Sequence, residues 1–133
     1  MSFQITGLKL SKEFTESLNI GVPEGSKDKN GISNVDKALL LEFGTENTPA
    51  RPFLTIGKEN IRTNKEFLNH FLNDKSTSGK IGVKEIQNVM DKFNFAPLKE
   101  STLASRRRRG NMSVQPTVDT ASLKNSLGYE ING

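Results

Sequence analysis

The 133-residue sequence contains no cysteine and no tryptophan, only one histidine and one tyrosine, and a low hydrophobic content of 33%. The absence of cysteine excludes disulfide bonds and thiolate metal sites, and it suits a reducing compartment. No apolar run of signal-peptide length opens the sequence, and no stretch approaches 18 consecutive apolar residues. We therefore expect a soluble protein made in the cytoplasm, with a small core and no membrane contact.

The groups that carry most enzyme chemistry are also scarce. His70 is the only histidine and has no Ser or Cys pattern beside it, so we interpret it as a surface residue. The acidic residues are scattered, whereas a metal site needs three or four clustered ligands. The sequence therefore predicts no catalytic residue, no metal and no cofactor, and we expect a protein that is not an enzyme.

The net charge of +4 comes almost entirely from one short run. Residues 1–98 contain 13 basic and 12 acidic residues, whereas Arg106, Arg107, Arg108 and Arg109 follow one another without an acid. One interpretation is contact with nucleic-acid phosphates, which displaces counterions and makes binding salt-dependent. The other is a solvated loop whose like charges keep it extended, or which pairs with an acidic neighbouring subunit. We favour the second, because no aromatic stacking residue accompanies the run.

Hydrophobic periodicity predicts a single α+β domain with a small, mainly antiparallel sheet packed by two main helices and additional short helices. Strands are expected at three places, two near the start of the chain and one in "GYEI" near its end. The apolar residues that predict the first two are Phe3, Ile5, Leu8 and Leu10, and then Leu18, Ile20 and Val22. The turn-rich residues 24–31 and the aperiodic residues 100–115 are predicted to be mobile loops.

Helical spacing recurs in the middle of the chain. A short helix is expected over about 35–43, although the run "ALLLEF" leaves a strand as the alternative. An amphipathic helix follows the Pro-rich connector, "KSTSG" is expected to break it, and a second helix packs antiparallel to the first. The core faces of the two are predicted to contain Ile61, Asn64, Leu68, Phe71 and Leu72, and then Ile86, Val89, Met90 and Phe93. A last short helix is expected after Asp119 or Thr120, either of which suits an N-cap.

The segment "LEFGTENTPARPFL", residues 41–54, predicts a rigid corner. Gly44 occupies the position of a left-handed C-cap, and Thr45 begins the connector. Pro49 and Pro52 fix φ near −65° and disfavour helix in the residues before them. Phe53 and Leu54 are expected to anchor the connector in the core.

Two charged residues of the same segment are predicted to lock the corner. Arg51 is expected to pair with Glu42 across the turn, since a bidentate pair would hold both ends of the connector. Such a corner positions surfaces and performs no bond chemistry.

The phenylalanines suggest self-association. A small domain is not expected to bury all of a set of six phenylalanines. Two of these, Phe67 and Phe95, lie off the predicted core stripes. Apolar groups left over from a core often mark subunit interfaces. The six are Phe14, Phe53, Phe67, Phe71, Phe93 and Phe95.

Two blocks of the sequence resemble one known family. "EFGT", comprising Glu42, Phe43, Gly44 and Thr45, followed by "PARPFL", is similar to a signature of tailed-phage virion morphogenesis proteins. These proteins often have an acid, an aromatic, Gly-Thr and then Pro-x-Arg-Pro-Phe. The ending "FAPLKESTLASRRRRG…QPTVDTASLKNSLGYEI" resembles the ending of the same family. It places these residues at family positions: Pro97, Leu98, Ser101, Thr102, Pro116, Asp119, Thr120, Leu123 and Ser126.

The resemblance runs from about residue 18 to the end, with two departures. Thr117 stands where Leu is usual and Ala121 where Gly is usual. The resemblance implies a non-enzymatic structural protein of the head–tail junction, as a neck, tail-completion or tail-terminator component of the virion. It further implies a homo-oligomeric ring, expected to be six-fold, that joins the tail to the head connector.

The expected partners are therefore copies of the chain itself, the head connector and tail proteins, with transient DNA contact in the channel. The protein would be made in the cytoplasm of the host bacterium and would end in the virion. Two rival classes remain. One is a small nucleic-acid-binding protein that uses Arg106–Arg109, and the other is a small hydrolase, for which no residue set is apparent.

Overall fold

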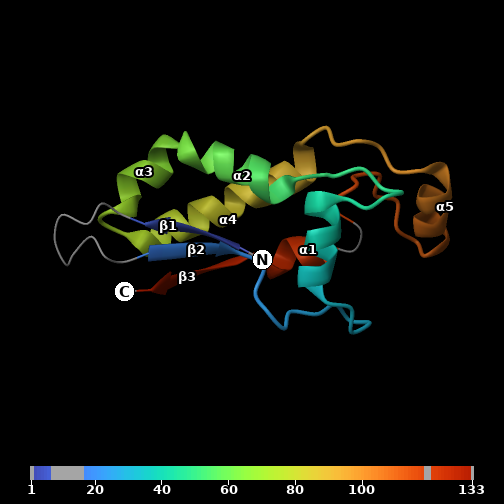
Figure 1. The fold of residues 1–133 in the computed structure, drawn as a ribbon, viewed down its shortest axis with the longest axis horizontal. Helices are drawn as coiled ribbons and strands as arrows, with labels where there is room; N and C mark the ends of the chain where they lie inside the picture. Colours follow the sequence, from blue (N-terminus) through green and yellow to red (C-terminus); the bar gives the residue numbers. More distant parts are fainter. Residues whose placement is uncertain (1, 7–16, 119–120, 133) are drawn as a thin grey trace.

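Alternating apolar residues build a sheet along one side of the molecule. The computed structural model describes residues 2–6, 17–118 and 121–132 (Figure 1). Within these residues β1 (Ser2–Thr6), β2 (Ser17–Gly21) and β3 (Gly128–Asn132) form an antiparallel sheet in the order β1-β2-β3. All three predicted strands are therefore confirmed, although the predicted positions Leu8 and Leu10 lie outside the described residues.

The register gives the sheet one apolar and one polar face. Phe3 lies opposite Ile20, which lies opposite Tyr129, while Gln4 lies opposite Asn19. Because successive side chains of a strand point to opposite faces, the apolar set shares the face that the helices cover. Ile20 is fully buried there.

The helix α4 (Lys75–Lys92) packs on this apolar face, along both β2 and β3. The prediction that "KSTSG" breaks the helices is wrong, because these residues form the first turns of α4. Asp74 caps them by accepting from the backbone N–H of Thr77 at 3.1 Å and from its hydroxyl at 2.6 Å. The small residues suit a close approach: a Cβ on Gly79 would lie 2.5 Å from the Tyr129 ring.

The other side of α4 packs against α2 (Phe53–Arg62) and α3 (Lys65–Phe71). These were predicted as one helix, but the chain breaks at Asn64, whose side chain accepts from the backbone N–H of Phe67 at 3.0 Å. The break resets the helical phase, so Phe67 and Phe71 are buried whereas Leu68 and Leu72 are exposed. The predicted core face of this segment is thus wrong at both leucines, and Phe67 is not left over.

The remaining helices are α1 (Asn34–Phe43), α5 (Glu100–Arg108) and α6 (Ser122–Ser126). The helix predicted over 35–43 is confirmed, and its strand alternative is excluded. Part of the loop predicted over 100–115 is the helix α5, which lies at one end of the long axis, far from α3 (Figure 1). The described residues thus form a single small α+β domain, as predicted.

Residues 24–31, predicted to be a mobile loop, lie in a hydrogen-bonded turn. The Asp28 carboxylate accepts from the backbone N–H groups of Asn30 and Ile32, both at 2.9 Å, and pairs with Lys37 of α1 at 2.5 Å. The hydrogen bond from Lys37 and those from the backbone hold the pKa of Asp28 below its ordinary value. The Asp28 carboxylate therefore joins the turn to α1, and Ser26 adds two hydrogen bonds that it accepts from Asn34.

The close approach of α4 to the sheet predicts that Gly79→Ala lowers the free energy of unfolding by up to about 2 kcal/mol. An alanine normally favours a helix interior over glycine by about 1 kcal/mol, but overpacking costs about 1–3 kcal/mol. The Tyr129 ring cannot easily swing away, because its hydroxyl is 2.8 Å from Ser76 Oγ. Urea unfolding measures the change, with the exposed neighbour Lys80→Ala as a control expected to stay within about 0.5 kcal/mol. A stabilised Gly79→Ala protein would contradict the packing described.

Candidate functional site

The corner predicted in residues 41–54 is built around Gly44. The backbone N–H of Gly44 donates to the carbonyl of Leu40 at 2.9 Å and closes α1, with φ at 70°. The chain then folds back through a turn in which the Thr45 N–H donates to the Thr48 carbonyl at 2.9 Å. A Cβ on Gly44 would lie 2.7 Å from both the Thr48 oxygen and the Ala50 nitrogen. Both the backbone angle and the space at this position therefore require glycine.

Glu42 is a buried residue of α1, and its side chain caps the next helix, α2. Its carboxylate accepts from the backbone N–H of Leu54 at 2.8 Å and from the hydroxyl of Thr55 at 2.5 Å. The residue at the N-cap position of α2 is Pro52, which offers no side-chain hydrogen bond. A carboxylate at a helix N-terminus satisfies amides that have no partner within the helix and complements the helix dipole. Glu42 thereby fixes α2 to the end of α1.

Arg51 is buried beside this cap and binds a third segment. Its Nε donates to the carbonyl of Ala96 at 2.8 Å and its Nη2 to that of Pro97 at 3.0 Å. Its backbone N–H donates to the carbonyl of Leu41. Burial lowers the pKa of the guanidinium from its ordinary value, yet arginine stays charged at neutral pH. Arg51 therefore joins the corner to the chain that leaves α4.

The predicted pair between Glu42 and Arg51 is wrong, because each has other partners. The Leu54 amide and the Thr55 hydroxyl donate to the carboxylate, and the guanidinium donates to the carbonyls after α4. The other predicted corner residues divide into two groups. Phe53 is fully buried and Pro52 half-buried, whereas Thr45 is exposed and Phe43 is 71% exposed.

The arginine run also differs from its prediction as a solvated loop. Arg106, Arg107 and Arg108 lie in the last turn of α5, where positive charge complements the helix dipole, and Glu100 lies in its first turn. Arg107 pairs with Glu100 at 2.6 Å. The acidic residue at the start of "ESTLASRRR" and the basic residues at its end are the sequence signals that indicate this helix. Arg109 follows at its C-cap.

Arg106 is the buried member of the run. Its Nη1 donates to the carbonyls of Ser113, Gln115 and Val118 at 3.2, 2.9 and 3.2 Å, and its Nη2 donates to that of Pro116 at 3.3 Å. One guanidinium thus shapes the chain that follows α5. It is not available to a nucleic-acid phosphate, so the predicted basic loop loses one of its four charges.

We name residues 111–115, which follow α5, the strap. Exposure alternates along it: Met112 is 72% and Val114 69% exposed, whereas Ser113 is half-buried. The Ser113 hydroxyl donates to the Val118 carbonyl at 2.9 Å. Because Arg106 binds the strap through its carbonyls, the strap presents Met112 and Val114 outward.

The predicted C-terminal motif lies partly within the described residues. Pro116 is half-buried and Leu123 of α6 is buried in the core, while Asp119 and Thr120 lie outside the described residues. The two departures from the family pattern each have a structural counterpart. Thr117 is buried and its hydroxyl donates to the Met90 carbonyl at 2.5 Å, and Ala121 has φ at 65°, in the region that favours glycine.

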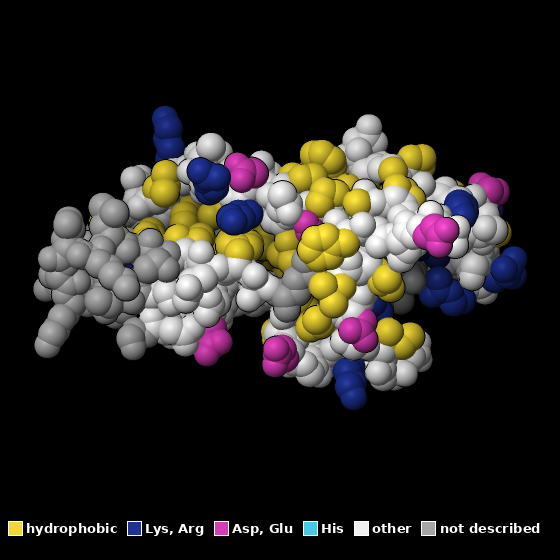
Figure 2. Space-filling view, in the orientation of Figure 1, with side chains coloured by type: hydrophobic (Ala, Val, Ile, Leu, Met, Phe, Trp, Pro, Cys, Tyr) yellow, Lys and Arg dark blue, Asp and Glu magenta, His cyan; other side chains and the backbone are white. Residues whose placement is uncertain are grey.

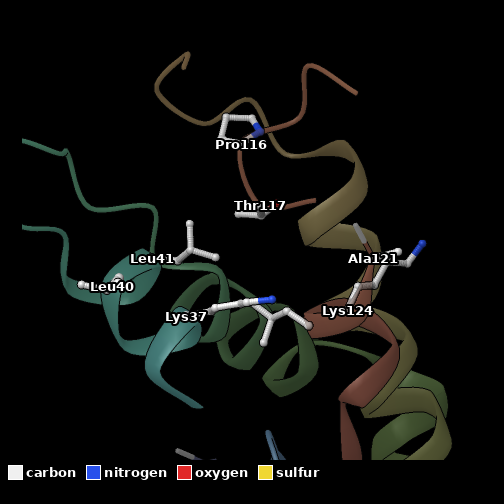
Figure 3. Close-up of a pocket in the computed structure, with 8 residues that line it drawn as sticks. Lys37, Leu40, Leu41, Pro116, Thr117, Ala121 and Lys124 are labelled. Carbon is white, nitrogen blue, oxygen red and sulfur yellow. The ribbon is translucent and has the colours of Figure 1, made fainter. Parts of the chain in front are cut away.

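A shallow hollow of about 270 Å³ separates α1 from this C-terminal segment (Figure 3). Leu40, Leu41 and Pro116 form much of its wall, and Lys37 and Lys124 lie at its sides. Both ammonium groups have carboxylate partners, Asp28 for Lys37 and Asp91 for Lys124. The hollow therefore offers mainly apolar contact.

Exposed apolar residues concentrate at α1 more than at the predicted phenylalanines. Phe53, Phe67, Phe71 and Phe95 are buried, and Phe14 lies outside the described residues. Phe93 is exposed, so its predicted place on a core face is wrong. We name Leu39, Leu40 and Phe43 the α1 face, since all three are exposed at helical spacing. Figure 2 shows hydrophobic side chains gathered over α1 and the connector that follows it. Helical spacing predicted a helix here but not which of its sides is exposed, so this face was missed.

Metal-ligating side chains are not clustered in the described residues. Among them no group of three or more His, Cys, Asp or Glu side chains could hold a metal ion, and His70 is exposed. Within the same residues no helix is both long enough and apolar enough to cross a membrane.

The space around Gly44 predicts that Gly44→Ala lowers the free energy of unfolding by about 2–5 kcal/mol. The backbone at Gly44, with φ at 70° and ψ at −173°, lies outside the αL region and costs a Cβ-bearing residue about 1–2 kcal/mol, and steric overlap adds about 1–3 kcal/mol. Gly25 is a matched control, because its φ is 79° and no atom lies within 4 Å of a Cβ built there. Gly25→Ala should show the backbone cost alone in urea unfolding. Equal losses in the two variants would disprove the steric role of the corner.

The binding of the strap by Arg106 predicts that Arg106→Ala costs about 2–4 kcal/mol, because four carbonyls lose a charged donor. Arg108→Ala is the control: the same residue type on the same helix, but exposed, should change stability by less than about 0.5 kcal/mol. Hydrogen exchange should also accelerate over residues 111–118 in the Arg106 variant only. Similar stability of the two variants would refute this role.

Comparison with family models, with curated proteins and with solved structures found no match to this chain.

Proposed function

We propose that this chain is a structural, non-enzymatic protein of a tailed-phage virion, located at the head–tail junction. It acts as a neck, tail-completion or tail-terminator component that assembles into a ring, and it joins the tail to the head connector. It is made in the cytoplasm of the host bacterium. Its partners are further copies of itself and the connector and tail proteins.

One observation carries the proposal. The residues of the "EFGT…PARPFL" segment build a corner in which Glu42, Gly44 and Arg51 are committed to backbone contacts, while Phe43 is presented to solvent. None of these side chains is arranged for bond chemistry. A rigid corner that exposes an apolar helix face is suited to binding another protein surface. The resemblance to virion morphogenesis proteins rests on the same residues.

Electron microscopy of the purified protein tests this proposal, first alone and then mixed with isolated connectors and tails. We expect closed rings with a central hole, and six subunits in class averages. Assembly on the connector or tail alone also supports the proposal, because such partners supply a template. A chain that stays monomeric in both settings, and is absent from purified virions, overturns it.

The competing function is nucleic-acid binding by the exposed arginines of α5. It is favoured by the local charge, since residues 99–109 contain five basic residues and one acid. Fluorescence anisotropy with duplex DNA distinguishes the two functions. Tight binding that weakens steeply with salt, and that Arg108→Ala reduces, would support a DNA-binding protein. Binding no stronger than that of an unrelated basic protein leaves the structural assignment in place.

A further inference from the structure

The α1 face combines apolar contact with negative charge. Asp36, Leu39, Leu40 and Phe43 lie along one side of the helix, because their spacings are three, one and three residues. Leu40 is 56% and Phe43 71% exposed. The carboxylates of Asp36 and of Glu46, which follows in the turn, have no ion-pair partner among the described residues. An occupant of this face therefore meets apolar side chains between two acids.

The hollow beside α1 extends this face. Leu40 belongs to both, since it lines the hollow together with Leu41 and Pro116 (Figure 3). The charges of Lys37 and Lys124 are already compensated by acids of the same chain. The electrostatic character of the surface is thus set by Asp36 and Glu46, and it favours a cationic, apolar occupant.

The strap and the end of α5 have the complementary character. Met112 and Val114 are presented outward, and the exposed Arg108 has no carboxylate partner among the described residues. Residues 99–109 contain five basic residues, Arg108 among them, and one acid; of these Arg106 is buried and Arg107 pairs with that acid, Glu100. Arg106 holds the strap from within, so its apolar side chains need no reordering before contact.

We propose that the α1 face of one copy binds the strap of the next copy. Electrostatics select this pairing: two α1 faces would bring carboxylates together, and two straps would oppose arginines. Contact between two different surfaces is head-to-tail, and repeated head-to-tail contacts close into a ring when the rotation allows. The inference deepens the proposed ring function and rests on it.

Each contact is small, with three apolar side chains on one surface and two on the other. A single pair of subunits is therefore held weakly, and closure of a ring strengthens it because the last contact is intramolecular. The charged residues beside both patches orient two subunits as they meet, so that a large buried area is not needed for specific contact.

The test uses one disabled surface at a time. The α1 variant carries Leu40→Ser and Phe43→Ser, and the strap variant carries Met112→Ser and Val114→Ser. A third protein with Leu68→Ser and Leu72→Ser is the control, because these leucines, in α3 and at its C-cap, are 53% and 55% exposed but lie outside both patches. All substituted residues are exposed or partly exposed, and circular dichroism verifies that each variant is folded.

Sedimentation velocity at concentrations where the wild type assembles gives the expected pattern. Each patch variant alone stays monomeric, with association weaker by at least about tenfold, while the α3 control assembles like the wild type. An equimolar mixture of the two patch variants stops at a heterodimer, because only one working contact remains. Self-assembly of either patch variant alone, or a monomeric mixture, overturns the proposal.

If the wild type is monomeric at every accessible concentration, cysteine cross-linking asks the same question. The chain contains no cysteine, so Leu39→Cys mixed with Val114→Cys should yield a mixed disulfide dimer well above the yield with Leu68→Cys. A yield equal to this control rules the contact out. The outcomes also separate the two proposals. Rings that persist in the strap variant refute this interface alone, whereas a heterodimer without virion incorporation refutes the neck assignment alone.

Discussion

The carboxylate of Glu42 at the first turn of α2 is the contact on which the arrangement of the helices depends. It accepts from the Leu54 N–H and the Thr55 hydroxyl, and so determines how α1 meets α2. Arg51 then fixes the chain after α4 to the same point. Since α4 also carries the sheet, the corner relates every layer of the domain to the exposed side of α1. The surface proposed for assembly therefore inherits its geometry from buried polar contacts.

Four charged side chains are buried among the described residues, and three of them, Glu42, Arg51 and Arg106, form hydrogen bonds to the backbone. Glu42 accepts from an amide, while Arg51 and Arg106 donate to carbonyls. Irregular segments leave backbone groups without partners, and burial of such groups is costly unless something else bonds them. In a chain with only 33% hydrophobic residues, arginine and glutamate perform a structural task that regular hydrogen bonding performs elsewhere. These side-chain hydrogen bonds therefore allow long irregular connections in a domain with a small hydrophobic core.

Much of the fold could be predicted from the sequence, because it follows from local periodicity. The alternation at Leu18 and Ile20, the helical spacing before Gly44 and the pattern of Ile86, Val89 and Met90 all have this character. The break at Asn64 was missed because its N-cap signal lies inside a continuous amphipathic pattern. That single break shifts the helical phase, so that Phe67 and Phe71 are buried and Leu68 and Leu72 are exposed.

The candidate site was harder to predict, because its partners are distant in sequence. Nothing near Arg51 indicates that it binds carbonyls at 96 and 97, and opposite charge made Glu42 the obvious partner. Four consecutive arginines likewise suggest one common role. The helix separates them, since adjacent residues on a helix point in different directions.

The way Arg106 binds the strap has a consequence for how such a surface can diversify. The guanidinium donates to carbonyl oxygens, which every residue supplies. It therefore holds the path of the chain whatever side chains the bound residues carry. Positions 112 and 114 can therefore exchange side chains while the fold is conserved. Substitutions at these two exposed positions would therefore change which partner surface the strap fits, while the buried arginine keeps the path of the chain.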